Sequence, residues 1–226
     1  MSFRGYPAGT LKFLRGLRAN NNRDWFKAHE AEYKGHYVEP AKDFVVAAGE
    51  ALRDFAPAIE AQPRVNGSMF RINRDIRFSR DKTPYKDHLD VWFWEGDRKR
   101  AVSSYFVRVA PDYVALGAGC HGFDAERLKT FRTAVAGRRS GADLVAIVTA
   151  LEAAGYSVGG HHYKRPPRGF SAGGRAADLL LFNALFVHAD EPVELATTPE
   201  LLPRCVEHWR RLAPLHRWLI DHVQDG

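Results

Sequence analysis

The spacing of hydrophobic residues divides the chain into three stretches. In residues 1–57, apolar side chains recur every three or four positions, which predicts helices with one buried face. In residues 69–119, short runs of β-branched and aromatic residues alternate with turn residues, which predicts strands. Helical spacing returns in residues 124–226, apart from an apolar run near 184–189 that we interpret as a possible fifth strand.

The first stretch predicts three helices. Thr10 is the expected N-cap of the first helix, and Asn22 is expected to cap the second. Phe26, Tyr33 and Tyr37 recur at helical spacing, and Trp25 and Phe26 are expected to pack inward. Pro40 marks the start of the third helix or a kink in it. The expected apolar stripe of that third helix consists of Ala41, Phe44, Val45, Ala48, Leu52 and Phe55.

The middle stretch predicts four strands, at about 69–79, 89–94, 102–109 and 113–117. Because the links between them are short, we expect an antiparallel meander from Met69 to Gly117. Helices on both sides of a run of strands are typical of the α+β class. The sequence therefore predicts one domain, residues 1–226, with a central antiparallel sheet of about four to five strands flanked by N-terminal and C-terminal helices.

Residues 70–88 combine a strand pattern with a polar loop. Phe70, Ile72, Ile76 and Phe78 share one parity and predict an apolar face. Arg74 has the same parity, and an unpaired buried charge costs several kcal/mol. We therefore expect either a bulge at 73–75 that turns Arg74 outward, or a carboxylate that pairs with it. In a regular strand, Asp81 or Asp90 is a better partner than Asp75, which points the opposite way.

The loop after Phe78 is expected to be rigid. Asp81 can accept a hydrogen bond from the backbone of Thr83 in an Asx-turn, and Pro84 restricts the next residue. The segment carries many more cations than anions. The cations are Arg71, Arg74, Arg77, Arg80, Lys82 and Lys86, and the anions are Asp75 and Asp81. Two interpretations remain open: a solvated sheet face with a structural turn, or a pocket for a phosphate or carboxylate.

The motif Phe-Arg-Ile-x-Arg-Asp-x-Arg-Phe-Ser-x-Asp-Lys-Thr-Pro-Tyr-Lys, at 70–86, resembles that of the uncharacterised family catalogued as domain of unknown function 2461. Two earlier segments are similar to the N-terminal motif of the same family: the apolar residues Phe13, Leu14 and Leu17, and the run Asn-Asn-Arg-Asp-Trp-Phe at 21–26. The resemblance extends from Leu11 to about Leu219. The family has no established activity, so the resemblance implies no reaction.

Composition limits the cellular compartment and the class of partner that we expect. The chain of 226 residues has a net charge of +6, and residues 64–100 contain ten Lys and Arg against six Asp and Glu. This local excess favours acidic partners. Two cysteines form no disulfide framework. The chain also shows no signal peptide and no apolar run long enough to span a membrane. We therefore expect a cytoplasmic protein without membrane contact.

Three functions fit these patterns. The first is a module that binds an anionic small molecule, a nucleotide or a nucleic acid. Its expected contacts are Arg71, Arg74, Arg77, Lys82, Tyr85 and Lys86, with Asp75 as an orienting group and Tyr85, Trp92 or Trp94 as a surface for a base. The second is an enzyme for a phosphorylated or carboxylated small molecule, with Asp81 or His88 as the acid or base. The third is a scaffold or subunit whose basic face binds an acidic protein.

No cofactor or metal site is expected. Cys120 and His121 are adjacent, so they point apart on a strand, and no further ligand at a suitable spacing completes a metal site. The sequence leaves open the oligomeric state and the role of the basic loop at 156–175.

Overall fold

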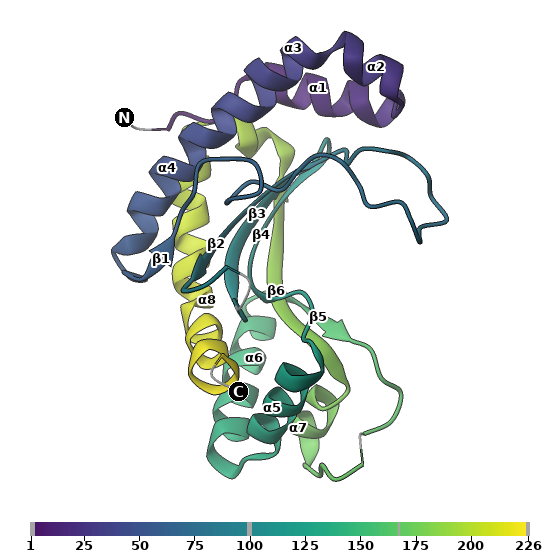
Figure 1. The fold of residues 1–226 in the computed structure, drawn as a ribbon. Helices are drawn as coiled ribbons and strands as arrows, with labels where there is room; N and C mark the ends of the chain where they lie inside the picture. Colours follow the sequence, from purple (N-terminus) through teal and green to yellow (C-terminus); the bar gives the residue numbers. More distant parts are fainter. Residues whose placement is uncertain (1–2, 99–100, 167, 225–226) are drawn as a thin grey trace. The chain divides into compact units, whose positions relative to one another are not determined.

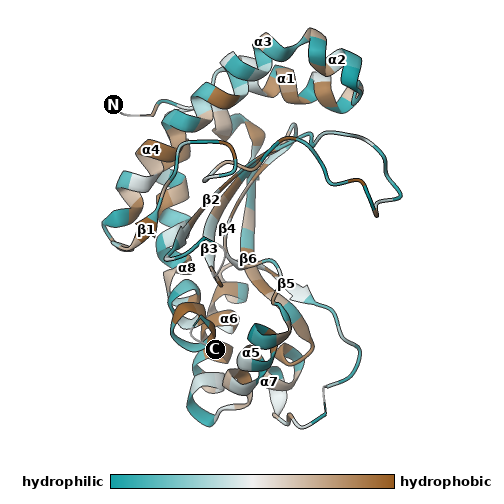
Figure 2. Cartoon of the chain, in the orientation of Figure 1, coloured by the Kyte–Doolittle hydropathy of each residue, from teal (hydrophilic) through white to brown (hydrophobic). Residues whose placement is uncertain are grey.

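The computed structural model describes residues 3–98, 101–166 and 168–224. These residues form an α+β fold whose antiparallel sheet has six strands in the order β1-β2-β3-β4-β6-β5 (Figure 1). The predicted fold class is therefore confirmed, with a strand count slightly above the expected four to five. Figure 2 shows that hydrophobic residues predominate along the central strands, whereas the segment between β1 and β2 is mostly hydrophilic.

The chain divides into two compact units. Unit 1 comprises Met1–Phe93, Phe106–Leu116 and Asp190–Glu207, and unit 2 comprises Trp94–Tyr105, Gly117–Ala189 and His208–Gly226. The single domain expected from the sequence stays a prediction.

Unit 1 begins with the helices that the apolar spacing predicts. α1 (Ala8–Ala19) is followed by α2 (Arg23–Ala28), α3 (Glu30–Glu32), the π-helical turn η1 (Tyr33–Val38) and α4 (Glu39–Arg53). Asn22 is the N-cap of α2, where its side chain accepts a hydrogen bond of 2.9 Å from the backbone of Trp25. Pro40 lies in the first turn of α4, and Phe44 of α4 packs its ring against that of Phe93, with 6.5 Å between centroids.

Thr10 is not the N-cap of α1, which begins two residues earlier, after Pro7. Proline has a preset φ and no N–H, so it suits the start of a helix. The hydroxyl of Thr10 instead donates to the backbone oxygen of His36 in η1, which ties α1 to the second half of the helical segment.

Three consecutive strands form the expected meander. They are β2 (Leu89–Glu95), β3 (Ser104–Val109) and β4 (Tyr113–Cys120). The expected fifth strand is β6 (Phe182–Pro192), which is longer than predicted. Two strands were not predicted, the two-residue β1 (Ile59–Glu60) and β5 (Ser157–His161). In β5 the pair Gly159-Gly160 resembles a turn signal, but Gly159 faces the Phe186 ring on β6, where a Cβ atom would lie 2.2 Å from the ring.

The strand predicted at 69–79 is wrong. Only Met69 and Asn73 form isolated bridges, and Phe78 is 96% exposed. The segment pairs loosely with the residues that follow it, because the Arg74 amide donates to the backbone oxygen of Pro84 (2.9 Å) and the Lys86 amide donates to that of Ile72 (2.8 Å). The intervening residues therefore leave the sheet as a long loop (Figure 1).

Helices make up most of the rest of the chain. They are α5 (Ala125–Ala136), α6 (Arg138–Ala153), α7 (Gly174–Leu179), the short 3₁₀ helix η2 (Val193–Thr197) and α8 (Leu201–Val223). Among the described residues, no helix combines the length and apolar character needed to cross a bilayer.

Unit 2 contains a buried polar cluster between strands and α8. One ring nitrogen of His216 lies 2.8 Å from the hydroxyl of Ser103, and the other lies 3.3 Å from a carboxylate oxygen of Glu95. All three residues are buried, and Tyr105 stacks on the His216 ring. Arg217 reaches the same carboxylate from the surface, at 3.1 Å. The polar groups of the cluster satisfy one another, and we interpret the cluster as structural.

Candidate functional site

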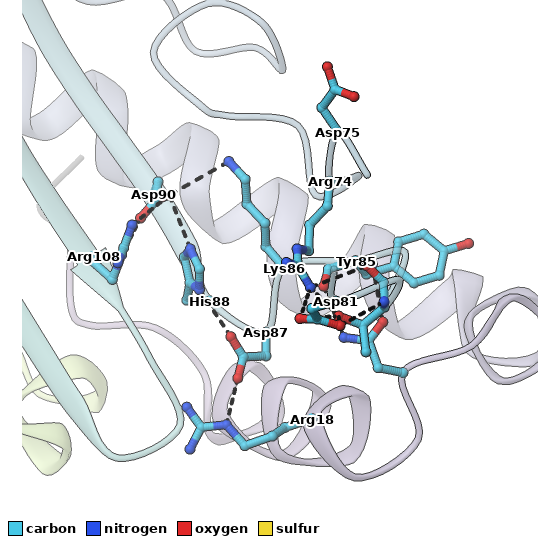
Figure 3. A pocket seen from close by; sticks show the side chains of 12 residues that line it. Arg18, Arg74, Asp75, Asp81, Tyr85, Lys86, Asp87, His88, Asp90 and Arg108 are labelled. Atoms are coloured by element: carbon cyan, nitrogen blue, oxygen red, sulfur yellow. Dashed lines mark hydrogen bonds and ion pairs between the residues drawn. The ribbon is translucent and has the colours of Figure 1, made fainter. Parts of the chain in front are cut away.

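A polar pocket of about 620 Å³ lies within unit 1, and we call it the Asp90 pocket (Figure 3). Its wall comes from α1 and the turn after it, from the loop between β1 and β2, and from residues near the start of β2 and near the end of β3. The lining residues are Arg18, Asn21, Arg74, Asp75, Asp81, Thr83, Tyr85, Lys86, Asp87, His88, Asp90 and Arg108.

Asp90 is the centre of one wall. It lies on β2 between the buried Leu89 and Val91, and its side chain is only 16% exposed. Arg108 on β3 donates to both of its oxygens, at 2.7 and 3.2 Å. His88 Nε2 lies 3.3 Å away and Lys86 Nζ 3.7 Å away. Burial by itself would raise the pKa of Asp90, but the hydrogen bonds from His88 and Arg108 outweigh it and hold the pKa well below its usual value.

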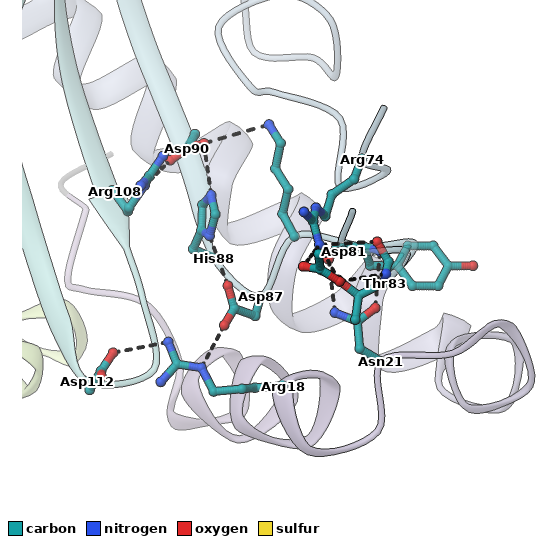
Figure 4. Close-up of polar contacts among 12 residues, drawn as sticks. Arg18, Asn21, Arg74, Asp81, Thr83, Asp87, His88, Asp90, Arg108 and Asp112 are labelled. Atoms are coloured by element: carbon teal, nitrogen blue, oxygen red, sulfur yellow. Dashed lines mark hydrogen bonds and ion pairs between the residues drawn. The ribbon is translucent and has the colours of Figure 1, made fainter. Parts of the chain in front are cut away.

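His88 lies between two carboxylates. Its Nδ1 is 3.0 Å from Asp87, which is bound in turn by Arg18 at 2.6 Å. Arg18 also donates to Asp112, so a row of alternating charges leads from Asp112 to Asp90 (Figure 4). A neutral imidazole carries one N–H, so both contacts of His88 are hydrogen bonds only when the ring is doubly protonated.

The opposite wall is built on the ion pair between Arg74 and Asp81. Arg74 Nη1 contacts both Asp81 and the hydroxyl of Thr83. Asp81 also accepts a hydrogen bond of 2.9 Å from the Thr83 backbone, which is the predicted Asx-turn. The Thr83 backbone and then the Arg74 guanidinium lower the pKa of Asp81 to about 2. Asp81 is therefore an anion at neutral pH and has no proton to donate as a general acid.

Lys86 is a partly buried cation whose ammonium lies 3.7 Å from the carboxylate of Asp90. Burial lowers the pKa of its ammonium, and the neighbouring Asp90 only partly offsets this effect. The ammonium also lies 4.7 Å from the centre of the Phe70 ring. An ammonium group has three donors, so Lys86 retains the capacity to bind a further acceptor.

Asn21 holds the loop against the turn between α1 and α2. Its side-chain amide donates to the backbone oxygen of Tyr85 at 2.9 Å, and its side-chain oxygen accepts from the Tyr85 amide at 3.1 Å. The Asn21 side chain thereby satisfies both backbone groups of Tyr85, as a neighbouring strand would. The Tyr85 ring points away from the Asp90 cluster and stacks on Phe26, with 4.2 Å between the centroids (Figure 3).

Asn21→Ala is therefore expected to destabilise the protein by about 1–2 kcal/mol, because two backbone groups of Tyr85 lose their partner. Urea denaturation followed by circular dichroism measures this loss. Asn20→Ala is the matched control, since the Asn20 side chain makes one exposed hydrogen bond to Gly16. Equal losses in the two variants would mean that Asn21 does not hold the loop.

The comparison with known families agrees with the two sequence motifs that contribute residues to the Asp90 pocket. The sequence profile described as "Conserved hypothetical protein (DUF2461)" matches residues 9–218. The chain belongs to the DUF2461 family. Searches of curated proteins and of solved structures found no significant match to this DUF2461 member.

The structure brings only part of the predicted site together. Of the expected contacts, Arg74, Tyr85 and Lys86 line the Asp90 pocket, as do the expected acid–base candidates Asp81 and His88. The remaining expected contacts, Arg71, Arg77 and Lys82, are exposed and lie outside its lining.

Asp75 lines the pocket of this DUF2461 protein but does not orient Arg74. It forms a two-pronged ion pair with Arg77, at 2.6 and 2.9 Å, and the Arg77 side chain is 75% exposed. Lys82 donates to the backbone oxygen of Ile76 at 2.9 Å. Trp94 is buried and cannot stack on a base.

Sequence reasoning gave no place in the site to five lining residues: Arg18, Asn21, Thr83, Asp87 and Arg108. It considered Asp90 only as a partner for Arg74. A signal for Asp90 and Arg108 was present, because each is a charged residue between buried apolar neighbours on its strand. Such positions face the polar side of a sheet, but the β2–β3 register is needed to pair them.

Proposed function

We propose that this protein binds a small phosphate- or carboxylate-bearing ligand in the Asp90 pocket. The observation that carries the proposal is the sharing of one carboxylate by Arg108, Lys86 and His88. The guanidinium of Arg108, the ammonium of Lys86 and the imidazole of His88 converge on a single carboxylate. A second anion would offset this local excess and add charge-assisted hydrogen bonds.

Lys86 is the proposed principal contact, with Arg74 on the opposite wall as the second. The 3.7 Å contact of Lys86 with Asp90 is long for a hydrogen bond. Arg74 makes its contacts with Asp81 and Thr83 through Nη1. Among the described residues, the other guanidinium nitrogens of Arg74 have no hydrogen-bond partner. These donors give the pocket capacity for an oxyanion.

The geometry supports binding rather than catalysis. Both ring nitrogens of His88 face carboxylates, so neither is directed to a substrate without a rearrangement. The low pKa of Asp81 makes it a weak base. Within the described part of the chain, no cluster of three or more His, Cys, Asp or Glu side chains is arranged to hold a metal ion.

A reducing compartment such as the cytoplasm fits this proposal. Cys120 and Cys205 are both free and buried. Burial raises the pKa of each thiol, which keeps the thiols protonated and unreactive.

Inorganic phosphate is the probe for the pocket. Saturation at about 100 times Kd should add about 2.7 kcal/mol of stability and raise Tm by roughly 5–10 °C. Sodium chloride at equal ionic strength should raise it much less. Lys86→Met is expected to lose most of the phosphate effect, because it removes the ammonium and keeps the length of the side chain.

Lys82→Met is the matched control, since it removes the same charge from the same segment outside the pocket. It should retain the phosphate effect. A wild-type protein that responds equally to phosphate and chloride would contradict the proposal, and so would equal losses in the two lysine variants.

A further inference from the structure

The loop between β1 and β2 presents aromatic rings to solvent. Among the described residues, three large apolar side chains are exposed: Val46, Phe70 and Phe78. The two phenylalanines lie in the basic segment 70–82 that borders the Asp90 pocket. Phe78 is 96% exposed and Phe70 is 37% exposed. An aromatic side chain as exposed as that of Phe78 loses the free energy of burial, which points to a partner for the ring, whereas the Phe70 ring packs against Trp92.

Each exposed ring is accompanied by a cation. The guanidinium carbon of Arg77 lies 5.8 Å from the centre of the Phe78 ring, and the ammonium of Lys86 lies 4.7 Å from that of Phe70. Arg71, Arg80 and Lys82 are exposed in the same segment. Its two anions, Asp75 and Asp81, already pair with Arg77 and Arg74. The segment therefore presents rings and positive charge together.

Local hydrogen bonds hold the loop in shape. The Thr83 amide donates to Asp81, the Lys82 ammonium donates to the backbone oxygen of Ile76, and the Ser79 amide lies 3.4 Å from that same oxygen. These contacts close the loop on both sides of Phe78 without covering its ring. The ring is thus presented on an ordered loop, which lowers the entropy cost of binding.

We propose that this segment binds single-stranded nucleic acid. A base stacks on Phe78, while Arg71, Arg80 and Lys82 contact phosphates. Aromatic platforms interleaved with cations are the pattern by which proteins hold single strands without reading sequence. A duplex keeps its base faces inside the stack, so it offers these rings no equivalent surface. Of the surface expected from the sequence, Tyr85 and Trp94 do not serve, because both residues are buried, whereas Trp92 is half-buried and its ring lies 5.5 Å from that of Phe70.

A fluorescein-labelled oligothymidine of about 20 nucleotides, at roughly 50 mM salt, tests the proposal by fluorescence anisotropy. Phe78→Ala should weaken binding about tenfold, the size of effect expected for one lost stacking contact. Phe78→Trp should retain binding because it keeps a flat ring. Phe78→Leu should weaken it as much as Phe78→Ala. Arg53→Ala, which removes an exposed cation of α4, should leave binding unchanged.

Salt dependence tests the phosphate contacts. Each phosphate contact to a single strand adds about −0.7 to the slope of log affinity against log salt, so three contacts give a slope of about −2. Arg80→Ala should reduce that slope by about 0.7. Phe78→Ala should keep the phosphate-induced rise in Tm, because the ring is not part of the pocket lining. The two proposals can thus fail separately.

Several results would overturn the nucleic-acid proposal. One is the absence of oligothymidine binding by the wild type at about 100 μM protein. Another is Phe78→Leu behaving as the wild type, which indicates an apolar contact without stacking. A third is binding to vesicles of phosphatidylserine and phosphatidylcholine, or to an acidic peptide such as polyglutamate, in place of the oligonucleotide.

Discussion

Asp90→Ala is expected to destabilise the protein by about 3–5 kcal/mol, because it leaves three positively charged or ionisable groups around an empty position. All three groups are partly buried, so hydration would replace only part of the contacts that Arg108, His88 and Lys86 lose with the carboxylate. Urea denaturation at pH 7 measures the loss as a fall in the free energy of unfolding. The same variant should also unfold at lower temperature.

Asp112→Ala is the control for this prediction. Asp112 pairs with Arg18 at the far end of the same row of charges, but its side chain is 63% exposed. Exposed ion pairs contribute about 0–1 kcal/mol, so the control should lose no more than that. Losses of equal size would show that burial of the Asp90 cluster does not matter to stability.

The contribution of Asp90 to folding stability should decrease at acidic pH. Its pKa is lowered in the folded protein, so below its unfolded pKa, about 3.9, the unfolded chain binds more protons. The stability it contributes is therefore complete above about pH 4–5 and is lost as the pH falls toward the folded pKa. Asp87 acts in the same direction, since the hydrogen bonds from Arg18 and His88 outweigh burial and lower its pKa.

Denaturation at a series of pH values from about 7 to 3 measures this dependence. The wild type should lose stability on acidification, and Asp90→Ala should lose less over the same range because one of the responsible groups is missing. A steeper acid dependence in the variant would contradict the assignment.

The second large effect is expected from Glu95→Ala in unit 2, at about 3 kcal/mol. Glu95 accepts from the buried ring of His216 and from Arg217, and the hydrogen bond from His216 is the main reason that its pKa is lowered. Removing the carboxylate leaves the buried imidazole facing a cavity without an acceptor. Urea denaturation again measures the loss.

Arg217→Ala separates the buried contact from the exposed one. The Arg217 side chain is about half exposed, so its ion pair with Glu95 should contribute about 1 kcal/mol or less. If Arg217→Ala costs as much as Glu95→Ala, the exposed pair carries the stability and the His216 contact does not.

Short-range features were the ones that the sequence predicted well. Three predicted contacts join residues that are at most seven positions apart. They are the N-cap of α2 by Asn22, the Asx-turn of Asp81 with Thr83, and the ion pair of Arg74 with Asp81. The meander of β2, β3 and β4 was predictable for the same reason, because its turns are short and its alternation is regular.

The strand predicted at 69–79 shows where this reasoning fails. Its alternation is as regular as that of β2, yet only Ile72 of its expected apolar face is fully buried. Alternation records which residues share a face, whereas a strand also needs a neighbour for its backbone. The backbone groups of Arg74 and Ile72 instead bond to Pro84 and Lys86.

The sequence by itself determined the fold class, the family, the meander and the position of the basic segment. Only the tertiary structure decided which charges from distant parts of the chain meet. Arg18 and Arg108 come from distant parts of the chain, and they give Asp87 and Asp90 their partners. It also decided that the Tyr85 ring is buried on Phe26 while Phe78 is left in solvent. The physical reason is that the pairing of a charge or a ring depends on strand register and chain reversal, which bring together residues that no local pattern connects.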